Sequence, residues 1–189
     1  MILPIVSYGD PILKKGTQDI GKNYPNLKEF IENMFETMYA APGVGLAAPQ
    51  VGLSIRLFVV DSTGYSNDNP ELNGFKKAFI NAKIIEEEGD EWLFNEGCLS
   101  FPTLREDILR KPKIHIQYAD ENFELHDEWY DGIKARIIQH EYDHTDGIVF
   151  VDRMSNLKKQ LIKGKLNDIM TGNVDVAYKM KFAKKKKKK

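Results

Sequence analysis

The motif His140-Glu141-Tyr142-Asp143-His144 constrains the fold more than any other segment, because its spacing would let two imidazoles act together on a helix. Residues four apart in a helix share one face. Ile133 and Ile137 extend this stripe, so both histidines are expected to point to the buried side. There they could bind one metal ion, with Glu141 as the proton carrier. The alternative is a pair of core histidines bonded to backbone groups.

The rest of the pattern predicts an α+β fold, with mainly antiparallel sheets around the central helix that bears this motif. Apolar periodicity indicates helices at residues 26–41, from near 133, and from 155 to 169. Asn26 and Glu29 resemble a capping box, and Ser155 is the expected cap of the third helix. A surface loop is expected at 62–74, and extended segments at 56–61, 79–87, 113–118 and 123–129, the last two forming a hairpin.

Length and composition indicate a single catalytic domain, expected over residues 1–174. A chain of 189 residues can bury a core without disulfides, and its one cysteine, Cys98, cannot form one within the chain. The N-terminus lacks the basic segment and long apolar run of a secretory signal. No apolar stretch approaches the roughly 20 residues that span a bilayer. We therefore expect an intracellular protein with no membrane partner.

The C-terminal residues 175–189 are expected to form a basic, disordered tail, because positions 184–189 are six consecutive lysines. The net charge of the chain is −1, and subtracting these six charges leaves −7 on the remainder. The tail could contact RNA by plain electrostatics, and hence the ribosome. A merely solvated tail or a cloning addition would have the same composition. No DNA partner is expected.

A catalytic metal site needs a third protein ligand beside the two histidines, and one open position. The metzincin extension of the motif has a third histidine where this chain has Phe150, so that class is disfavoured. Asp168 could supply a carboxylate, although nothing around it marks a ligand. Cys98 is the better candidate, because a thiolate beside a divalent cation is deprotonated and binds strongly. Taken alone, a single cysteine is more often a small buried apolar residue.

Three segments together resemble the signature blocks of the peptide deformylase family. They are residues 43–52 (GVGLAAPQVG), 96–100 (EGCLS) and 139–144 (QHEYDH), in the family's order. The resemblance extends from about Pro4 to about Lys159. Two positions depart from the family pattern, since Thr145 stands where leucine is usual and Arg136 where many relatives are apolar. The first could loosen packing beneath the metal, and the second could alter the rim of the substrate pocket.

The resemblance implies removal of the formyl group from the N-terminal formyl-methionine of newly made proteins, with release of formate. It implies that Glu141 takes a proton from the attacking water and passes it to the leaving amine. It further implies that the Gln50 side-chain amide and the Leu99 backbone N–H stabilise the oxyanion. The expected partners are N-formylmethionyl nascent peptides, and the expected location is the cytoplasm of a bacterium.

The resemblance also implies one divalent metal ion, held by Cys98, His140 and His144, that activates the water. Two imidazoles and a thiolate suit zinc by ligand type. The family resemblance instead favours Fe²⁺, with Zn²⁺, Ni²⁺ or Co²⁺ able to occupy the site. An iron–thiolate centre would be sensitive to oxygen, because both the metal and the cysteine can oxidise.

The substrate peptide is expected to bind beside the glycine-rich block. Gly45 could hydrogen-bond its main chain in a strand-like manner, and Gly97 permits a close backbone approach. Arg105 matches a position where relatives often have an arginine facing the peptide. An apolar pocket for the methionine side chain is expected from Val44, Ile133, Ile137 and the stem of His140. Taken singly, each of these could instead be a turn former, a surface charge or a core residue.

Two other functions stay open on the residues alone. An H-E-x-x-H zinc endopeptidase would use a carboxylate as its third ligand and would keep its metal in a Cys98→Ala variant. A non-catalytic metal- or RNA-binding module would rely on the lysine tail and would release no formate. Glu141 argues against such a module, because purely structural metal binding has no need of it.

Overall fold

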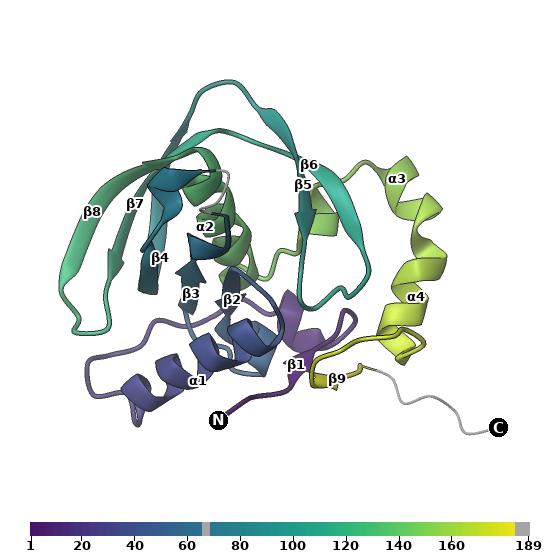
Figure 1. Ribbon diagram of the computed structural model, residues 1–189, viewed down its shortest axis with the longest axis horizontal. Coiled ribbons are helices and arrows are strands. Elements are labelled where there is room, and N and C mark those ends of the chain that lie inside the picture. Colours follow the sequence, from purple (N-terminus) through teal and green to yellow (C-terminus); the bar gives the residue numbers. More distant parts are fainter. Residues whose placement is uncertain (66–68, 184–189) are drawn as a thin grey trace.

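A five-stranded antiparallel sheet, in the order β2-β3-β4-β7-β8, forms the largest part of the fold. The computed structural model describes residues 1–65 and 69–183 of the chain. The strands of this sheet are β2 (Gly45–Ala47), β3 (Leu57–Asp61), β4 (Lys76–Glu88), β7 (Lys113–Ala119) and β8 (Leu125–Asp131). The helix α2 (Gly132–Thr145) follows β8 directly and lies in the middle of the molecule (Figure 1).

Two smaller strand pairs complete the sheet structure. The hairpin of β5 (Trp92–Gly97) and β6 (Arg105–Arg110) lies on the other side of α2 from β7 and β8 (Figure 1). β1 (Ile5–Val6) pairs in parallel with β9 (Met180–Lys181). The other helices are α1 (Leu27–Ala40), α3 (Asn156–Leu161) and α4 (Lys163–Thr171), with 3-10 turns at Pro11–Lys14, Ala48–Val51, Ser62–Tyr65, Pro70–Leu72 and Phe150–Arg153.

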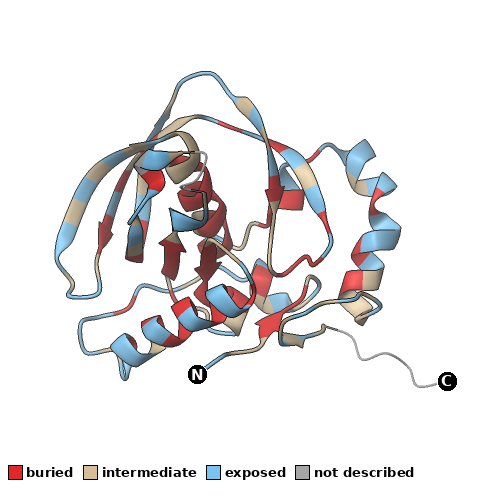
Figure 2. Ribbon diagram, in the orientation of Figure 1, coloured by how far each residue is buried: buried red, intermediate tan, exposed pale blue. Residues whose placement is uncertain are grey.

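The central helix α2 is buried along most of its length, as Figure 2 shows. Its apolar side chains Ala135, Ile137 and Ile138 pack into a cluster with Phe58 and Phe79 of the large sheet. A second apolar cluster lies under the β5–β6 hairpin and includes Phe101, Ile108, Phe150 and Ile169. Because apolar material covers the helix on both sides, its polar side chains must find partners within the protein.

The expected α+β class, with mainly antiparallel sheets around the H-E-x-x-H helix, is confirmed. The helix expected at residues 26–41 is α1, but its expected capping box is wrong. Asn26 has a left-handed backbone with φ of 53°, and its side chain makes no capping hydrogen bond. An N-cap side chain reaches the first-turn N–H groups from an extended backbone, which Asn26 does not have.

The helix expected from residue 155 to 169 is two helices, because the helical conformation is interrupted at Ile162 between α3 and α4. The Ser155 cap is confirmed, since its side chain accepts a hydrogen bond from the Lys158 N–H at 3.3 Å. The β5–β6 hairpin is not apparent from the sequence. Its second strand, Arg105–Arg110, reads REDILR, and four charged residues in six conceal the alternation of a strand.

Residues 175–183, which the sequence assigned to the tail, include β9, and the Ala183 N–H donates to Ser7 Oγ at 3.0 Å. The six lysines at 184–189 lie outside the described residues, as do residues 66–68 of the expected surface loop. Among the helices of the described ranges, none combines the length and the apolar character needed to cross a membrane.

A substitution at Phe79 tests how strongly the fold depends on the apolar cluster between α2 and the large sheet. The residue is fully buried, and its ring centroid lies 4.7 Å from that of Phe58 and 4.3 Å from that of Tyr118. We expect Phe79→Ala to lower the free energy of unfolding by about 3–5 kcal/mol, measured by urea denaturation. Leu125→Ala, at a side chain 88% exposed, should change it by less than about 0.5 kcal/mol. Equal losses in both variants would contradict this account of the core.

Candidate active site

Cys98, His140 and His144 converge at the end of the β5 strand. One ligand atom from each lies within 4.8 Å of the other two, and Cys98 Sγ is 3.3 Å from His144 Nε2. Cys98 comes one residue after β5, whereas both histidines project from α2 one turn apart. The structure therefore brings together the three residues that the sequence predicted as metal ligands, although 42 positions separate Cys98 from His140.

This donor set fits a divalent transition metal. A thiolate and two imidazoles supply three soft or borderline ligands, which is the number a catalytic site uses when it leaves one position open. Both histidines are buried, and Cys98 is half-buried at the cleft. Burial, together with the neighbouring charges of His140 and Arg110, holds the pKa of His144 well below its ordinary range. The ring is therefore neutral, which is the form that binds a metal.

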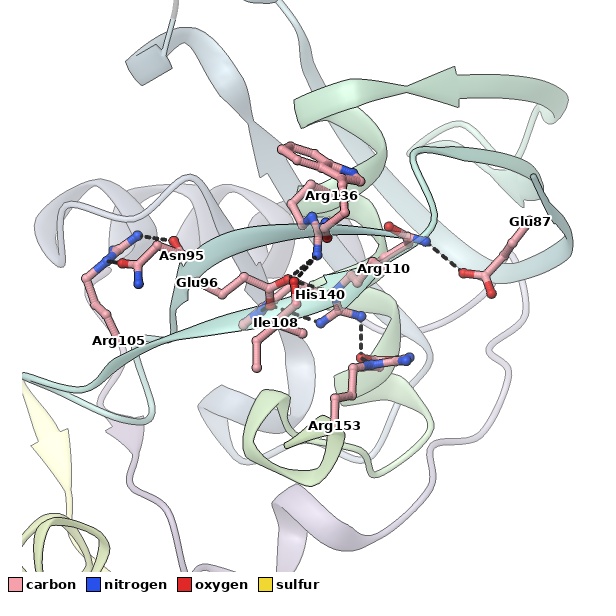
Figure 3. A network of polar contacts seen from close by, with 12 residues as sticks. Glu87, Asn95, Glu96, Arg105, Ile108, Arg110, Arg136, His140 and Arg153 are labelled. Carbon is pink, nitrogen blue, oxygen red and sulfur yellow. Dashed lines mark hydrogen bonds and ion pairs between the residues drawn. The ribbon is translucent and has the colours of Figure 1, made fainter. Parts of the chain in front are cut away.

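Glu96, the residue two positions before Cys98, fixes the orientation of His140. Its Oε2 lies 2.8 Å from His140 Nδ1, so the other ring nitrogen is left for a metal (Figure 3). Arg110 donates to both carboxylate oxygens, at 2.7 and 3.0 Å, and Arg136 donates at 3.0 Å. Burial alone would raise the pKa of Glu96, but the hydrogen bonds and charges of His140 and Arg110 hold it well below its ordinary range. Glu96 is therefore an ionised carboxylate.

A second buried carboxylate, Asp143, extends this network along α2. Arg110 donates to Asp143 at 2.7 Å, and Arg153 donates to both of its oxygens, each at 2.6 Å. Arg110 thus bridges Glu96 on β5 and Asp143 on α2, and Figure 3 shows Glu96, Arg110 and Arg153 in this network. Charge-assisted hydrogen bonds of this kind are short and directional. They hold the hairpin, the central helix and the turn at Phe150–Arg153 in one arrangement.

The side chain of Glu141 is buried and lies against Gly45. Burial raises the pKa of Glu141 to about 7, so its carboxyl group gains and loses a proton near neutrality. Among the described residues, none hydrogen-bonds its Oε2. A Cβ built on Gly45 would lie 2.7 Å from both Cγ and Cδ of Glu141. Glycine at position 45 is therefore what allows the carboxylate to lie against β2.

Gln50 and Leu99 lie next to Cys98. The Gln50 Oε1 accepts from the Ala47 N–H at 2.8 Å, which turns its Nε2 toward Cys98 Sγ and Ser100 Oγ, both at 3.4 Å. The Leu99 N–H finds no acceptor among the described residues. A fixed amide donor and an uncommitted backbone donor beside the metal ligands are the parts from which an oxyanion site is made.

A cleft of about 370 Å³ opens onto Cys98, Leu99, His140 and Glu141, whereas Gln50 and His144 are not among its lining residues. Its walls include five of the six residues predicted to bind substrate, namely Val44, Gly45, Gly97, Arg105 and Ile137. The sixth, Ile133, is not among the residues that line the cleft and packs instead against the apolar cluster beneath α2. Arg105 is exposed, and its guanidinium donates to the side chain and the backbone carbonyl of Asn95 at 2.8 and 2.6 Å.

Arg136 and Thr145, the two residues that depart from the family pattern, are both buried and both form hydrogen bonds. Besides its bond to Glu96, Arg136 donates to the Trp92 carbonyl at 2.8 Å, and its guanidinium carbon lies 4.6 Å from the centroid of the Trp92 ring. Arg136 also lines the cleft. Thr145 donates to the Tyr142 carbonyl at 2.7 Å and accepts from Arg56 at 3.2 Å. Hydrogen bonds therefore take the place of apolar packing at both positions.

Two residues at the site were missed by reasoning from the sequence. Glu96 carried a signal, because it stands within the EGCLS block, two residues before Cys98. Tyr178, which lines the cleft, carried none, because its position depends on the pairing of β9 with β1. The alternative ligand Asp168 lies on α4, where it accepts from Asn173 at 3.1 Å, and it does not join the group of Cys98 and the histidines.

A thiolate, two imidazoles and a buried carboxylate at one cleft are the parts of a metal-dependent hydrolase. Comparison with known proteins narrows this class. The family model described as polypeptide deformylase matches residues 2–160, and the chain belongs to this family. The peptide deformylase of Flavobacterium johnsoniae is 57% identical, with 99% of each chain covered. That of Cytophaga hutchinsonii is 50% identical, covering 98% of this chain and all of the relative.

Solved structures of peptide deformylases also match this chain and support the family assignment. A peptide deformylase from Legionella pneumophila matches with a TM-score of 0.79 at 34% identity, over 89% of this chain and 95% of that one. One from Thermotoga maritima matches with a TM-score of 0.74 at 40% identity, over 82% of this chain and 99% of that one. The chain is therefore a hydrolase of the amide bond of N-terminal formyl-methionine and uses a divalent metal ion. The endopeptidase and the non-catalytic module are set aside.

The contact between Glu96 and His140 predicts a loss of metal affinity in Glu96→Gln. The amide keeps the size of the side chain but removes the charge that orients the imidazole. We expect the affinity to fall by about 10- to 100-fold, measured by competition with a chromophoric chelator.

Glu106→Gln is the matched control, because Glu106 lies opposite Glu96 on β6 and makes no ion pair with a described residue. The unfolding midpoint of each variant is measured as well, to check that the protein used in the titration is folded. Unchanged affinity in folded Glu96→Gln would rule out the orienting role.

Proposed function

We propose that this chain removes the formyl group from N-formylmethionyl nascent peptides in the bacterial cytoplasm, as one catalytic domain. Cys98, His140 and His144 hold Fe²⁺, and Glu141 is the proton carrier. The observation that carries the proposal is the convergence of Cys98, His140 and His144 at one point, next to a cleft that Cys98, His140 and Glu141 line. Bacterial relatives support the location.

The choice of Fe²⁺ rests on the family resemblance, whereas the ligand types alone suit Zn²⁺ equally. When bound, the ion supplies Lewis-acid activation of a water molecule and of the formyl carbonyl. The thiolate explains why such a centre would lose activity in air, since both Cys98 and iron can oxidise. Anaerobic handling is therefore part of any test.

Glu141 is the group that moves the proton. Its carboxylate takes a proton from the attacking water and delivers it to the amine nitrogen as the formyl C–N bond breaks. The pocket formed by Gly45 and α2 keeps it from competing hydrogen bonds, and its Oε2 has no partner among the described residues. The carboxylate is thus free to serve the reacting atoms.

Gln50 and Leu99 stabilise the negative charge that develops on the formyl oxygen. The Ala47 N–H and the side chain of Ser100 hold the Gln50 amide in place, so little reorganisation is needed as the charge forms. The Leu99 N–H supplies the second donor. Preorganised donors of this kind each contribute about a hundred-fold or more in turnover.

The peptide chain of the substrate binds as an added strand. Among the described strands, β2 lies at the edge of its sheet and pairs only with β3, and Gly45 at its start lines the cleft. Gly97 at the end of β5 lines the cleft as well. Val44 and Ile137 provide apolar walls for the methionine side chain, and Arg105 lies at the exposed end. Main-chain pairing gives affinity for any sequence, whereas the pocket selects the first residue.

A contact with the ribosome through the basic tail is also proposed, on charge alone. The six lysines at 184–189 lie outside the described residues, so the proposal rests on their sequence. Binding through such a tail would weaken steeply as salt is raised.

The deciding test is formate release from formyl-Met-Ala-Ser under anaerobic conditions. We expect the parent protein to release formate, and Glu141→Gln to be slower by at least about a hundred-fold because the proton carrier is lost. Glu106→Gln, a carboxylate outside the cleft, should match the parent. Equal rates in the parent and Glu141→Gln would overturn the proposed mechanism.

Gly45→Ala tests the placement of Glu141 without altering a ligand. The added methyl would overlap Cγ and Cδ of Glu141, so the carboxylate must shift. We expect kcat to fall by about a hundred-fold, as small misplacements of catalytic groups typically cause, with metal content unchanged. Gly21→Ala is the control, because no atom lies within 4 Å of a Cβ at that position. Full activity of Gly45→Ala would show that Glu141 does not depend on this contact.

A further inference from the structure

The C-terminal segment returns to the active site after the part of the chain matched by the family model, which ends at residue 160. β9 pairs with β1 through Ile5 opposite Met180, and the Ser7 N–H donates to the Lys181 carbonyl at 2.9 Å. Figure 1 shows this strand next to β1, below the β5–β6 hairpin. Tyr178, two residues before β9, is thereby placed at the cleft, which it lines.

Residues 98–101 form a tight turn that carries both the thiolate and the Leu99 N–H. The Phe101 N–H donates to the Cys98 carbonyl at 2.8 Å and closes the turn. The Tyr8 N–H donates to the Ser100 carbonyl at 2.9 Å. The Leu99 carbonyl between them accepts from the Tyr178 hydroxyl at 2.8 Å. The C-terminal segment thus supplies the bond to the middle peptide group of the turn.

The middle peptide group is the part of a tight turn that the closing hydrogen bond does not hold. Turns of types I and II share the same closing bond and differ by a rotation of that group. Here such a rotation would reverse the Leu99 carbonyl and move the backbone of Ser100. The side chain of Ser100 contacts Gln50, so the rotation would disturb the amide donor as well as the turn that bears Cys98.

We propose that Tyr178 is a positioning residue, whose hydroxyl locks the turn at residues 98–101 in the conformation that aligns Gln50 and the Leu99 N–H. Tyr178 also packs, with Leu99 and Met180, against a third apolar cluster, so its ring stays in place when the hydroxyl is removed. This cluster includes Ile5, Met38, Leu46 and Leu57. The inference rests on the proposed function, because it assigns Tyr178 a part in that same reaction.

The test compares Tyr178→Phe with Tyr39→Phe. Both variants lose one phenol hydroxyl that donates a hydrogen bond, since Tyr39 donates to Asp61 at 2.6 Å, but Tyr39 is on the surface of α1 and does not line the cleft. We expect Tyr178→Phe to lower kcat for formyl-Met-Ala-Ser by about 3- to 10-fold, the typical worth of one hydrogen bond, with KM and metal content unchanged. Tyr39→Phe should match the parent.

Amide hydrogen exchange of the segment 98–101 gives a readout that needs no activity. It should speed up by a similar factor, about 3- to 10-fold, in Tyr178→Phe and not in Tyr39→Phe. If the parent is active, Tyr178→Phe must show both a lower kcat and faster exchange at residues 98–101. A variant that shows only one of these changes, or neither, overturns the inference. If the parent releases no formate, the proposed function is wrong whatever the variants show. In that case, unchanged exchange in Tyr178→Phe would separately show that the Tyr178 hydroxyl does not hold the turn.

Discussion

The site depends on one buried carboxylate that three cationic or titratable groups share. Glu96 lies on β5, Arg110 on β6, and Arg136 and His140 on α2, and all three partners contact the Glu96 carboxylate within 3.0 Å. A carboxylate as buried as this would be strongly destabilising without them. The hairpin and the helix therefore have one relative position in which every charge is paired. In that position Cys98 lies beside the histidines.

Such a network fixes geometry more than it adds stability, because desolvation of the charges offsets much of their attraction. The arrangement here matches that role. Asp143 forms ion pairs with Arg110 of the hairpin and with Arg153 of the turn that follows α2. The helix is therefore held through Asp143 as well as through the residues that contact Glu96. The chain thus places a row of ion pairs along α2, where an apolar face alone would let the hairpin slide relative to the helix. Metal ligands need this precision, since small displacements weaken binding.

How far the sequence leads depends on how local each contact is. The H-E-x-x-H helix follows from spacing alone, because positions 140 and 144 are one helical turn apart. The strands at 56–61 and 113–118 follow from short apolar or alternating runs. Thiolate chemistry made Cys98 the better candidate for the third ligand, and the family resemblance then supported it, since no local pattern joins residues so far apart. The contact of Glu96 with Arg110 depends on the pairing of β5 with β6, and that of Tyr178 on the pairing of β9 with β1. The sequence carries no periodic signal for either pairing.

The parallel pairing of β1 with β9 has a consequence for the order of events during biosynthesis. Every other described element leaves the ribosome before β9, so β1 has no strand partner until β9 has emerged. Contacts of such high sequence separation form late, because the long loop must close before they can stabilise anything. The helix and the hairpin can therefore meet before β9 is available, whereas the hydrogen bond from Tyr178 to the catalytic turn forms afterwards. The metal ligands could therefore assemble first, and full activity would follow only once β9 has emerged and paired with β1.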